Sequence, residues 1–294
     1  MNRPARTAAL AALALLATSG CTASHAHSHP QTSAAPVTPG ATSWHGDFRA
    51  FGTPQWRRTW GAVDQGAWGA ADFAAVEDPS APGGAGALQV TYGAGSSANS
   101  CTDCPNPGGG QFYTDLNTLG LPALAQSPTL DLKYALKFPT GRDWGKAGKL
   151  PGLYGGRIGE ESGGTHGSGW STRYMWRTAK GTPDNGEVYL YTPTASGPTG
   201  YGVDEGLGDW HFQADDHWHT VEQLIDRTTG DITVWYDGRQ VHHASATATG
   251  IAALPFAGIL FSTFYGGHDT TWGPTTPQHA WFADFSLSTT PQHP

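Results

Sequence analysis

Residues 131–138 read DLKYALKF, and large apolar side chains occupy every second position of this stretch. A period of two is typical of a β-strand with one buried face, because successive side chains point to opposite sides. Residues 219–226 and 231–236 are two further strand-like stretches, joined by Arg227-Thr228-Thr229-Gly230. That spacing predicts a β-hairpin. Residues 258–265 and 280–288 continue the series of strands.

The composition agrees with an all-β fold. The 41 glycines and 21 prolines supply turns, and the 14% of charged residues argues against long amphipathic helices. We expect one short helix, at 121–125. Many strands separated by turns, with no alternation of strand and helix, predict an antiparallel two-sheet sandwich. We expect a β-jelly roll of concanavalin-like plan, whose concave sheet forms a cleft.

The chain divides into three parts. Residues 1–21 begin with Arg3 and Arg6, continue with an apolar run and end in small residues, which is the pattern of a signal peptide. Cys21 follows Thr18-Ser19-Gly20, so it is either the lipidated cysteine of a bacterial lipoprotein or part of an ordinary secretory signal. Residues 22–43 read as a disordered linker, and 44–290 as one large β-domain. We expect an extracellular protein that meets a membrane only through a possible lipid anchor.

Cys101 and Cys104 are the remaining cysteines. In an exported chain a short-loop disulfide between them is favoured over metal binding, because zinc would need further ligands at a partner spacing. We expect no metal and no cofactor.

The stretch 149–191 carries the candidate site. Residues two apart on a strand share a face, so Ser171 pairs with Arg173 and Tyr189 with Tyr191. Lys149 lies at the edge of this group, in the segment KLPGLYGG. Gln111, from a neighbouring strand, and His166, in a glycine-rich loop, are further candidates for binding substrate. Together these residues supply a hydroxyl, a guanidinium, phenols and an amine. Groups of these kinds are suited to binding an acidic sugar.

The charge distribution supports an anionic ligand. The chain carries a formal net charge of −8, yet residues 133–180 hold nine of its sixteen basic residues and three of its twenty-four acidic ones. A basic window on an acidic body attracts a polyanion locally, although such residues are commonly scattered and solvated. An acidic overall balance without a nucleic-acid-binding motif argues against DNA or RNA. We therefore expect a monomer whose partner is an acidic polysaccharide.

The segments KLPGL-GG, G-W-S-x-R-x-M-W-R, Y-x-Y and FSTFYGG (261–267) together resemble polysaccharide lyase family 14. The glucuronan lyases of polysaccharide lyase family 20 are similar in overall plan. The resemblance covers about 111–287 and implies a jelly-roll lyase acting on alginate or another polyuronate. It also implies that Lys149 is the catalytic lysine, with Ser171, Arg173 and the tyrosine pair in the same site.

Elimination from a polyuronate needs three groups. One neutralises the carboxylate, a base removes the C5 proton, and an acid protonates the departing O4. Arg173 suits the first task, because its planar fork matches a carboxylate. Tyr189 and Tyr191 are each able to act as acid or base, and we expect nearby cations to lower the pKa of these tyrosines. Lys149 is able either to act as the base, if Arg173 lowers its pKa, or to neutralise the carboxylate itself. The alternatives are a glucuronan lyase and a non-catalytic carbohydrate-binding sandwich.

Overall fold

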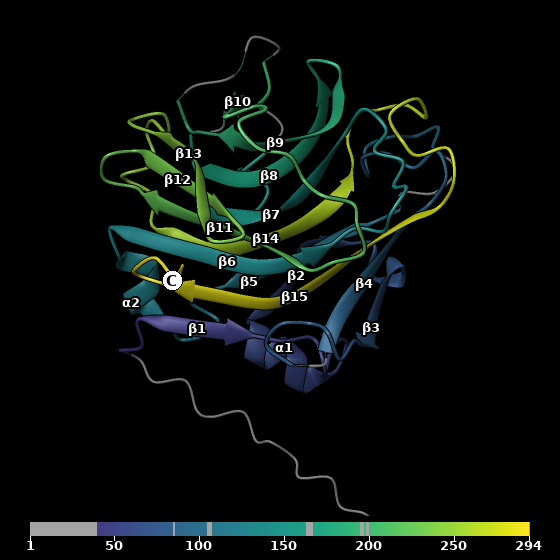
Figure 1. The fold of residues 1–294 in the computed structure, drawn as a ribbon. Coiled ribbons are helices and arrows are strands. Elements are labelled where there is room, and N and C mark those ends of the chain that lie inside the picture. Colours follow the sequence, from purple (N-terminus) through teal and green to yellow (C-terminus); the bar gives the residue numbers. More distant parts are fainter. Residues whose placement is uncertain are drawn as a thin grey trace, which may run out of the picture. The chain divides into compact units, whose positions relative to one another are not determined.

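The computed structural model describes residues 40–84, 86–104, 108–162, 167–194, 197 and 200–293. They belong to one compact unit, Pro36–Pro294. The unit is an antiparallel β-jelly roll built from two layers of strands (Figure 1). The predicted fold class is confirmed.

The first sheet has the strand order β13-β12-β11-β6-β15-β4-β3, with β1 paired to β15. Its strands are β1 (Ser43–Gly46), β3 (Phe73–Glu77), β4 (Gly86–Tyr92), β6 (Thr129–Lys137), β11 (His219–Asp226), β12 (Asp231–Tyr236), β13 (Arg239–Ala244) and β15 (Gln278–Ser288). The predicted hairpin is β11 and β12, which pair directly in an antiparallel register.

The second sheet has the order β10-β9-β8-β7-β14-β5-β2 and carries the candidate site. Its strands are β2 (Ala62–Trp68), β5 (Gly110–Asp115), β7 (Ala147–Gly156), β8 (Gly169–Ala179), β9 (Thr182–Tyr191), β10 (Val203–Glu205) and β14 (Phe256–Tyr265). We call the side of this sheet that faces away from the other sheet the site face.

Side chains from both sheets fill the space between them. On β6, Leu132, Tyr134 and Leu136 are buried, as their alternation predicts. The Tyr134 ring stacks on Phe285 of the neighbouring β15 at 4.6 Å, and its hydroxyl crosses the core to donate to the Pro151 carbonyl at 3.1 Å. That bond satisfies a polar group in an otherwise apolar layer.

Helices are few in the described part of the chain. α2 (Pro122–Gln126) lies where a short helix was expected. α1 (Pro54–Trp60) was not predicted, although its ends carry the usual signals: the Thr53 side chain accepts a bond from the Trp56 amide, and Gly61 ends the helix at φ 54°. A 3₁₀ turn covers Ala70–Asp72. At seven residues α1 is too short to show a clear helical period in sequence.

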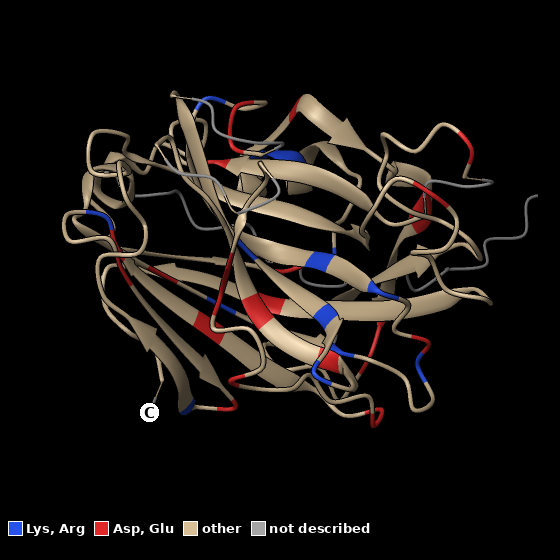
Figure 2. Cartoon of the chain, turned by 90° about the horizontal axis from the view of Figure 1, so that it is seen from above, with Lys and Arg blue, Asp and Glu red and all other residues tan. Residues whose placement is uncertain are grey.

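The basic residues of 133–180 do not form one surface, so the interpretation of this window as a single basic patch is wrong. Lys133 and Lys137 lie on β6 of the first sheet, where they pair with Glu222 and Asp78. Arg142 is buried beneath aromatic rings. Figure 2 shows basic and acidic residues interspersed over the fold. Three basic side chains from the window do converge on the site face: those of Lys149, Arg173 and Arg177.

Candidate active site

Strand parity brings the predicted residues together on the site face. In the register of β8 and β9, Arg173 lies opposite Tyr189, and Ser171 lies opposite Tyr191. The alternate residues Val188 and Leu190 are buried in the core between the sheets. The two tyrosines therefore point away from that core, and their rings meet edge to face at 5.3 Å.

Lys149 reaches the same space from within β7. Its amine lies 3.2 Å from the centre of the Tyr189 ring and 5.7 Å from that of Tyr191, and it donates to Met175 Sδ at 2.8 Å. The expectation that Lys149 lies at the edge of the group is wrong, because Lys149 is a residue of a central strand and 6% exposed. Burial, followed by the charge of Arg173, holds the pKa of Lys149 well below its usual range.

A bulge in β7 turns Lys149 toward the site face. Lys149 pairs with Met175, and Gly152, three residues on, pairs with Arg173, so the register shifts between them. In a regular strand two residues three apart face opposite sides, yet here both face the site, while Leu150 and Leu153 both enter the core. Pro151 suits this position because it has no amide hydrogen to place in a ladder.

Arg173 is held in place from β14. Its Nη1 donates to Ser262 Oγ at 3.1 Å, and Ser262 in turn donates to Gln111 Oε1 at 2.9 Å. The guanidinium is 3% exposed, and its Nε has no hydrogen-bond partner among the residues described. A buried donor of this kind is suited to a carboxylate, which would satisfy it.

Ser171 and Gln111 are engaged with protein groups. Ser171 is buried and donates to the Glu161 carbonyl at 2.7 Å, so it ties β8 to the loop that follows β7. Gln111 donates to Gly66 O at 2.9 Å and to the Tyr113 hydroxyl at 3.0 Å. Both side chains thus hold neighbouring parts of the site together, and their binding of substrate stays a prediction. His166 lies outside the described residues.

Burial acts on Tyr189 more strongly than the surrounding cations do. Its pKa is raised above the usual phenol range, first by burial and then by Tyr191, while Arg177 acts in the opposite direction. The expectation that nearby cations would lower the pKa is therefore wrong for Tyr189. A phenol of this kind keeps its proton at neutral pH and is available as a hydrogen-bond donor or acid.

Sequence reasoning missed several residues of this face. Ser262 lies in the FSTFYGG segment, and Met175 lies between the two arginines of β8. Arg177 and Glu187 were visible by parity, since they extend the series 173–177 and 187–191. No sequence pattern identified Asp204 as a residue of the site, because its position depends on the pairing of β10 with β9.

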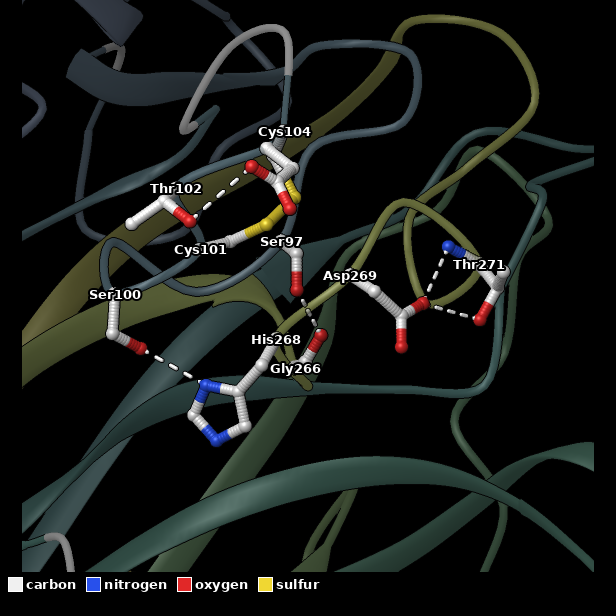
Figure 3. Close-up of a disulfide and its surroundings, with 10 residues drawn as sticks. Ser97, Ser100, Cys101, Thr102, Cys104, Gly266, His268, Asp269 and Thr271 are labelled. Atoms are coloured by element: carbon white, nitrogen blue, oxygen red, sulfur yellow. Dashed lines mark hydrogen bonds between the residues drawn. A yellow bond between two sulfur atoms is a disulfide. The ribbon is translucent and has the colours of Figure 1, made fainter.

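The disulfide loop contacts the connection between β14 and β15 (Figure 3). We call these two loops together the rim. Cys101 and Cys104 are joined by a disulfide. Ser97 donates to Gly266 O at 2.6 Å, and Ser100 lies 3.1 Å from His268 Nδ1. The His268 ring lies 6.4 Å from the ring of Tyr201, which precedes β10.

In the described part of the chain, no group of three or more His, Cys, Asp or Glu side chains is arranged to hold a metal ion. No helix there is long and apolar enough to span a membrane.

A jelly roll with an amine, a guanidinium and two phenols converging on one sheet has the plan of a polysaccharide lyase. A family model described as Polysaccharide lyase 14 matches residues 81–285. The chain belongs to this family and is a polysaccharide lyase.

Solved structures share the fold. A PL-14 alginate lyase from Aplysia kurodai is 23% identical, with a TM-score of 0.65 over 84% of this chain and 98% of that one. The alginate lyase vAL-1 from a Chlorella virus is 21% identical, with a TM-score of 0.56 over 74% and 89%. An endo-β-1,4-glucuronan lyase from Trichoderma reesei is 14% identical, with a TM-score of 0.53 over 85% and 96%. A search of curated proteins found no match.

Proposed function

We propose that the protein cleaves a polyuronate by β-elimination, with alginate as the first candidate substrate. The observation that carries the proposal is the contact between Lys149 and Tyr189 beside Arg173. This contact brings together an amine, a phenol and a guanidinium, which are the groups that the proposal uses as base, acid and carboxylate-binding group. The alginate lyases that share the fold favour alginate, and the glucuronan lyase among them makes glucuronan the second candidate.

Arg173 binds the carboxylate of the sugar that loses its proton. Its buried Nε and Nη groups neutralise the charge that develops when C5 becomes a carbanion, and the low exposure of the site strengthens this interaction. Ser262 keeps the guanidinium fork in a fixed orientation.

The directions of the two pKa shifts support the proposed proton transfers. Lys149, whose pKa is lowered, takes the C5 proton as a neutral amine. Tyr189, whose pKa is raised, holds a proton and gives it to O4 as the C4–O4 bond breaks. The electron pair of the C5–H bond becomes the C4=C5 double bond. The products are an unsaturated uronate and a new hydroxyl end.

Elimination is distinguished from hydrolysis and from simple binding by the ultraviolet absorbance of the unsaturated product. Alginate, polymannuronate, polyguluronate and glucuronan should be incubated separately with the enzyme. Rising absorbance with one of the first three supports an alginate lyase, and a response to glucuronan alone shifts the substrate to that polymer. If reducing ends appear without absorbance, the enzyme hydrolyses its substrate and the proposal is wrong.

Export completes the proposal. We propose that the enzyme works outside the cell as a monomer, where large polysaccharides are found. The support is the sequence of residues 1–21, with Cys21 as the candidate lipid attachment site.

A further inference from the structure

Arg177 extends the cationic side of the site beyond Arg173. Both residues lie on β8, four positions apart, so they share the site face. Arg177 Cζ is 5.4 Å from the centre of the Tyr189 ring, and the side chain is 24% exposed. The mechanism proposed above gives this guanidinium no task.

Two carboxylates hold Arg177, and they differ in their access to solvent. Arg177 Nε donates to Glu187 Oε1 at 2.9 Å, and Nη2 donates to Asp204 Oδ1 at 2.9 Å. The Glu187 side chain is 0% exposed, whereas that of Asp204 is 40% exposed. Burial raises the pKa of Glu187 to about 7 against the opposing effect of Arg177. Glu187 is thus a fixed internal partner, and Asp204 a solvent-accessible one.

The bond to Asp204 is the one that a ligand can replace. Exposed ion pairs contribute little to stability, typically about 0 to 1 kcal/mol, because water competes for both groups. A carboxylate arriving along the site face would meet the same Nη2 edge of the guanidinium. No further hydrogen bond from Nη1 occurs within the described residues, so this edge also offers a second donor.

The spacing fits a polymer with one carboxylate on every sugar. The Cα atoms of strand residues four apart are separated by about 13 Å. The two guanidinium groups also lie beside different tyrosines: Arg173 Cζ is 5.7 Å from the centre of the Tyr191 ring, and Arg177 Cζ is 5.4 Å from that of Tyr189. We therefore expect a carboxylate bound at Arg177 to belong to a different sugar from the one bound at Arg173.

We propose that Arg177 is a second uronate-binding subsite, occupied by Asp204 in the free enzyme and by a substrate carboxylate in the complex. This inference rests on the proposed function, since it assumes a polyuronate substrate. It adds a binding residue, Arg177, and an exchangeable internal competitor, Asp204.

The test measures binding without turnover. A polymannuronate tetrasaccharide is titrated by calorimetry into protein carrying Lys149→Met, which cannot consume it. Asp204→Asn is added to this background, and Asp184→Asn serves as the matched control. Asp184 is also on the second sheet, where it pairs with His211 and has no hydrogen bond to Arg177, and its substitution makes the same change in net charge.

Removal of the competitor should tighten binding. We expect Asp204→Asn to lower Kd by about 3- to 5-fold, which corresponds to the loss of a competing exposed ion pair worth up to about 1 kcal/mol. Asp184→Asn should leave Kd within about 2-fold. Arg177→Gln should raise Kd, and Asp204→Asn should give no gain when Arg177→Gln is present, because the competitor then has nothing to block.

Other results would overturn the subsite. An unchanged or weaker affinity in Asp204→Asn would show that Asp204 supports the site. A gain in affinity that persists when Arg177→Gln is present, or that Asp184→Asn also produces, would have a different cause. It would show that removing any negative charge reduces the repulsion of the anionic ligand. Failure of the wild-type enzyme to form an unsaturated product would refute the elimination, but the binding comparison would still decide the subsite.

Discussion

At the scale of single residues, the chemistry depends on how strongly burial acts on two neighbouring groups. Lys149 and Tyr189 are in contact, and burial moves their pKa values in opposite directions. Desolvation disfavours the charged form of each, so the amine tends to be neutral and the phenol protonated. The proposed base and the proposed acid thus arise from one environment.

The first prediction concerns the lysine. Lys149→Met keeps an apolar chain of similar length but removes the amine. We expect turnover to fall by at least about 100-fold, the usual contribution of a general base. The melting temperature should be unchanged or higher, because a buried amine is costly to desolvate. Absorbance assays and thermal unfolding check both parts, and near wild-type turnover would remove Lys149 from the mechanism.

The second prediction concerns the carboxylate clamp. Arg173→Lys keeps the charge but loses the planar fork, so we expect kcat/KM to fall by about 10- to 100-fold. Ser262→Ala, which removes only the partner of Arg173, should have a smaller effect. Steady-state kinetics on the preferred polymer give both values. If Arg173→Lys is as active as the wild type, a point charge is sufficient and the bidentate role is wrong.

At the scale of strands, the bulge of β7 and the closeness of β8 determine where Lys149 points. A Cβ added to Gly152 would lie 2.3 Å from the Thr172 carbonyl oxygen and 2.4 Å from Arg173 Cα. Both are backbone atoms of the adjacent strand, so they cannot rotate away. In the KLPG segment, Pro151 therefore needs no hydrogen bond of the sheet, and Gly152 lets the backbone of β8 approach closely.

The third prediction follows from this packing. Gly152→Ala should destabilise the fold by about 1 to 3 kcal/mol, the usual cost of overpacking, and should lower activity by displacing Arg173. Gly167→Ala is the control, because a Cβ there meets nothing within 4 Å. Urea unfolding of both variants measures the difference. Equal stability of the two variants would show that β7 and β8 can move apart without cost.

The fourth prediction concerns an ion cluster between two edge strands, β13 of the first sheet and β10 of the second (Figure 1). His242 on β13 lies 3.2 Å from Glu205 on β10 and 2.8 Å from Asp209. Glu205, then Asp209, raises the pKa of His242 against the effect of burial. Protonated His242 therefore stabilises the folded state. This stabilisation is complete below the pKa of His242 in the unfolded chain, about 6.5, and is lost as pH rises through the pKa of His242 in the folded protein.

The free energy of unfolding should therefore decrease from about pH 6 to about pH 9 by more in the wild type than in His242→Gln. Urea titrations across this range measure the two slopes. His243→Gln, at an exposed neighbouring position, should keep the wild-type slope. Identical slopes in His242→Gln and the wild type would exclude His242 as the linked group.

At the scale of the whole molecule, the site is the meeting point of four neighbouring strands, of which β14 is distant from the other three in the chain. β7, β8, β9 and β14 each contribute a side chain to the contacts of Lys149 and Arg173. The disulfide loop and the β14–β15 connection add a rim (Figure 3). One sheet can therefore supply every group that an elimination needs.

The fifth prediction concerns export. We expect Cys21→Ser to release the protein into the medium or to block its processing, because stable anchoring requires the several acyl chains of a bacterial lipoprotein. Cell fractionation and N-terminal sequencing of the mature protein provide the measurement. A wild-type protein that is wholly soluble, with a mature N-terminus other than Cys21, would identify an ordinary secretory signal.

The sequence by itself determined the class of fold and the pairing of residues along each strand. Alternation is a local property, so DLKYALKF predicted the core positions of β6, and the parity of Tyr189 and Tyr191 predicted their common face. The same rule would have found Arg177 and Glu187, which continue these two series.

The tertiary structure decided the rest. The β7 bulge changes the parity between Lys149 and Gly152, and the neighbouring strands on both sides record the shift in register. The pKa directions of Lys149 and Tyr189 depend on burial within the assembled sheet, which no single strand produces. Asp204 reaches Arg177 because β10 pairs with β9. Strand register and desolvation both depend on contacts between different strands. The local sequence pattern alone therefore does not predict them.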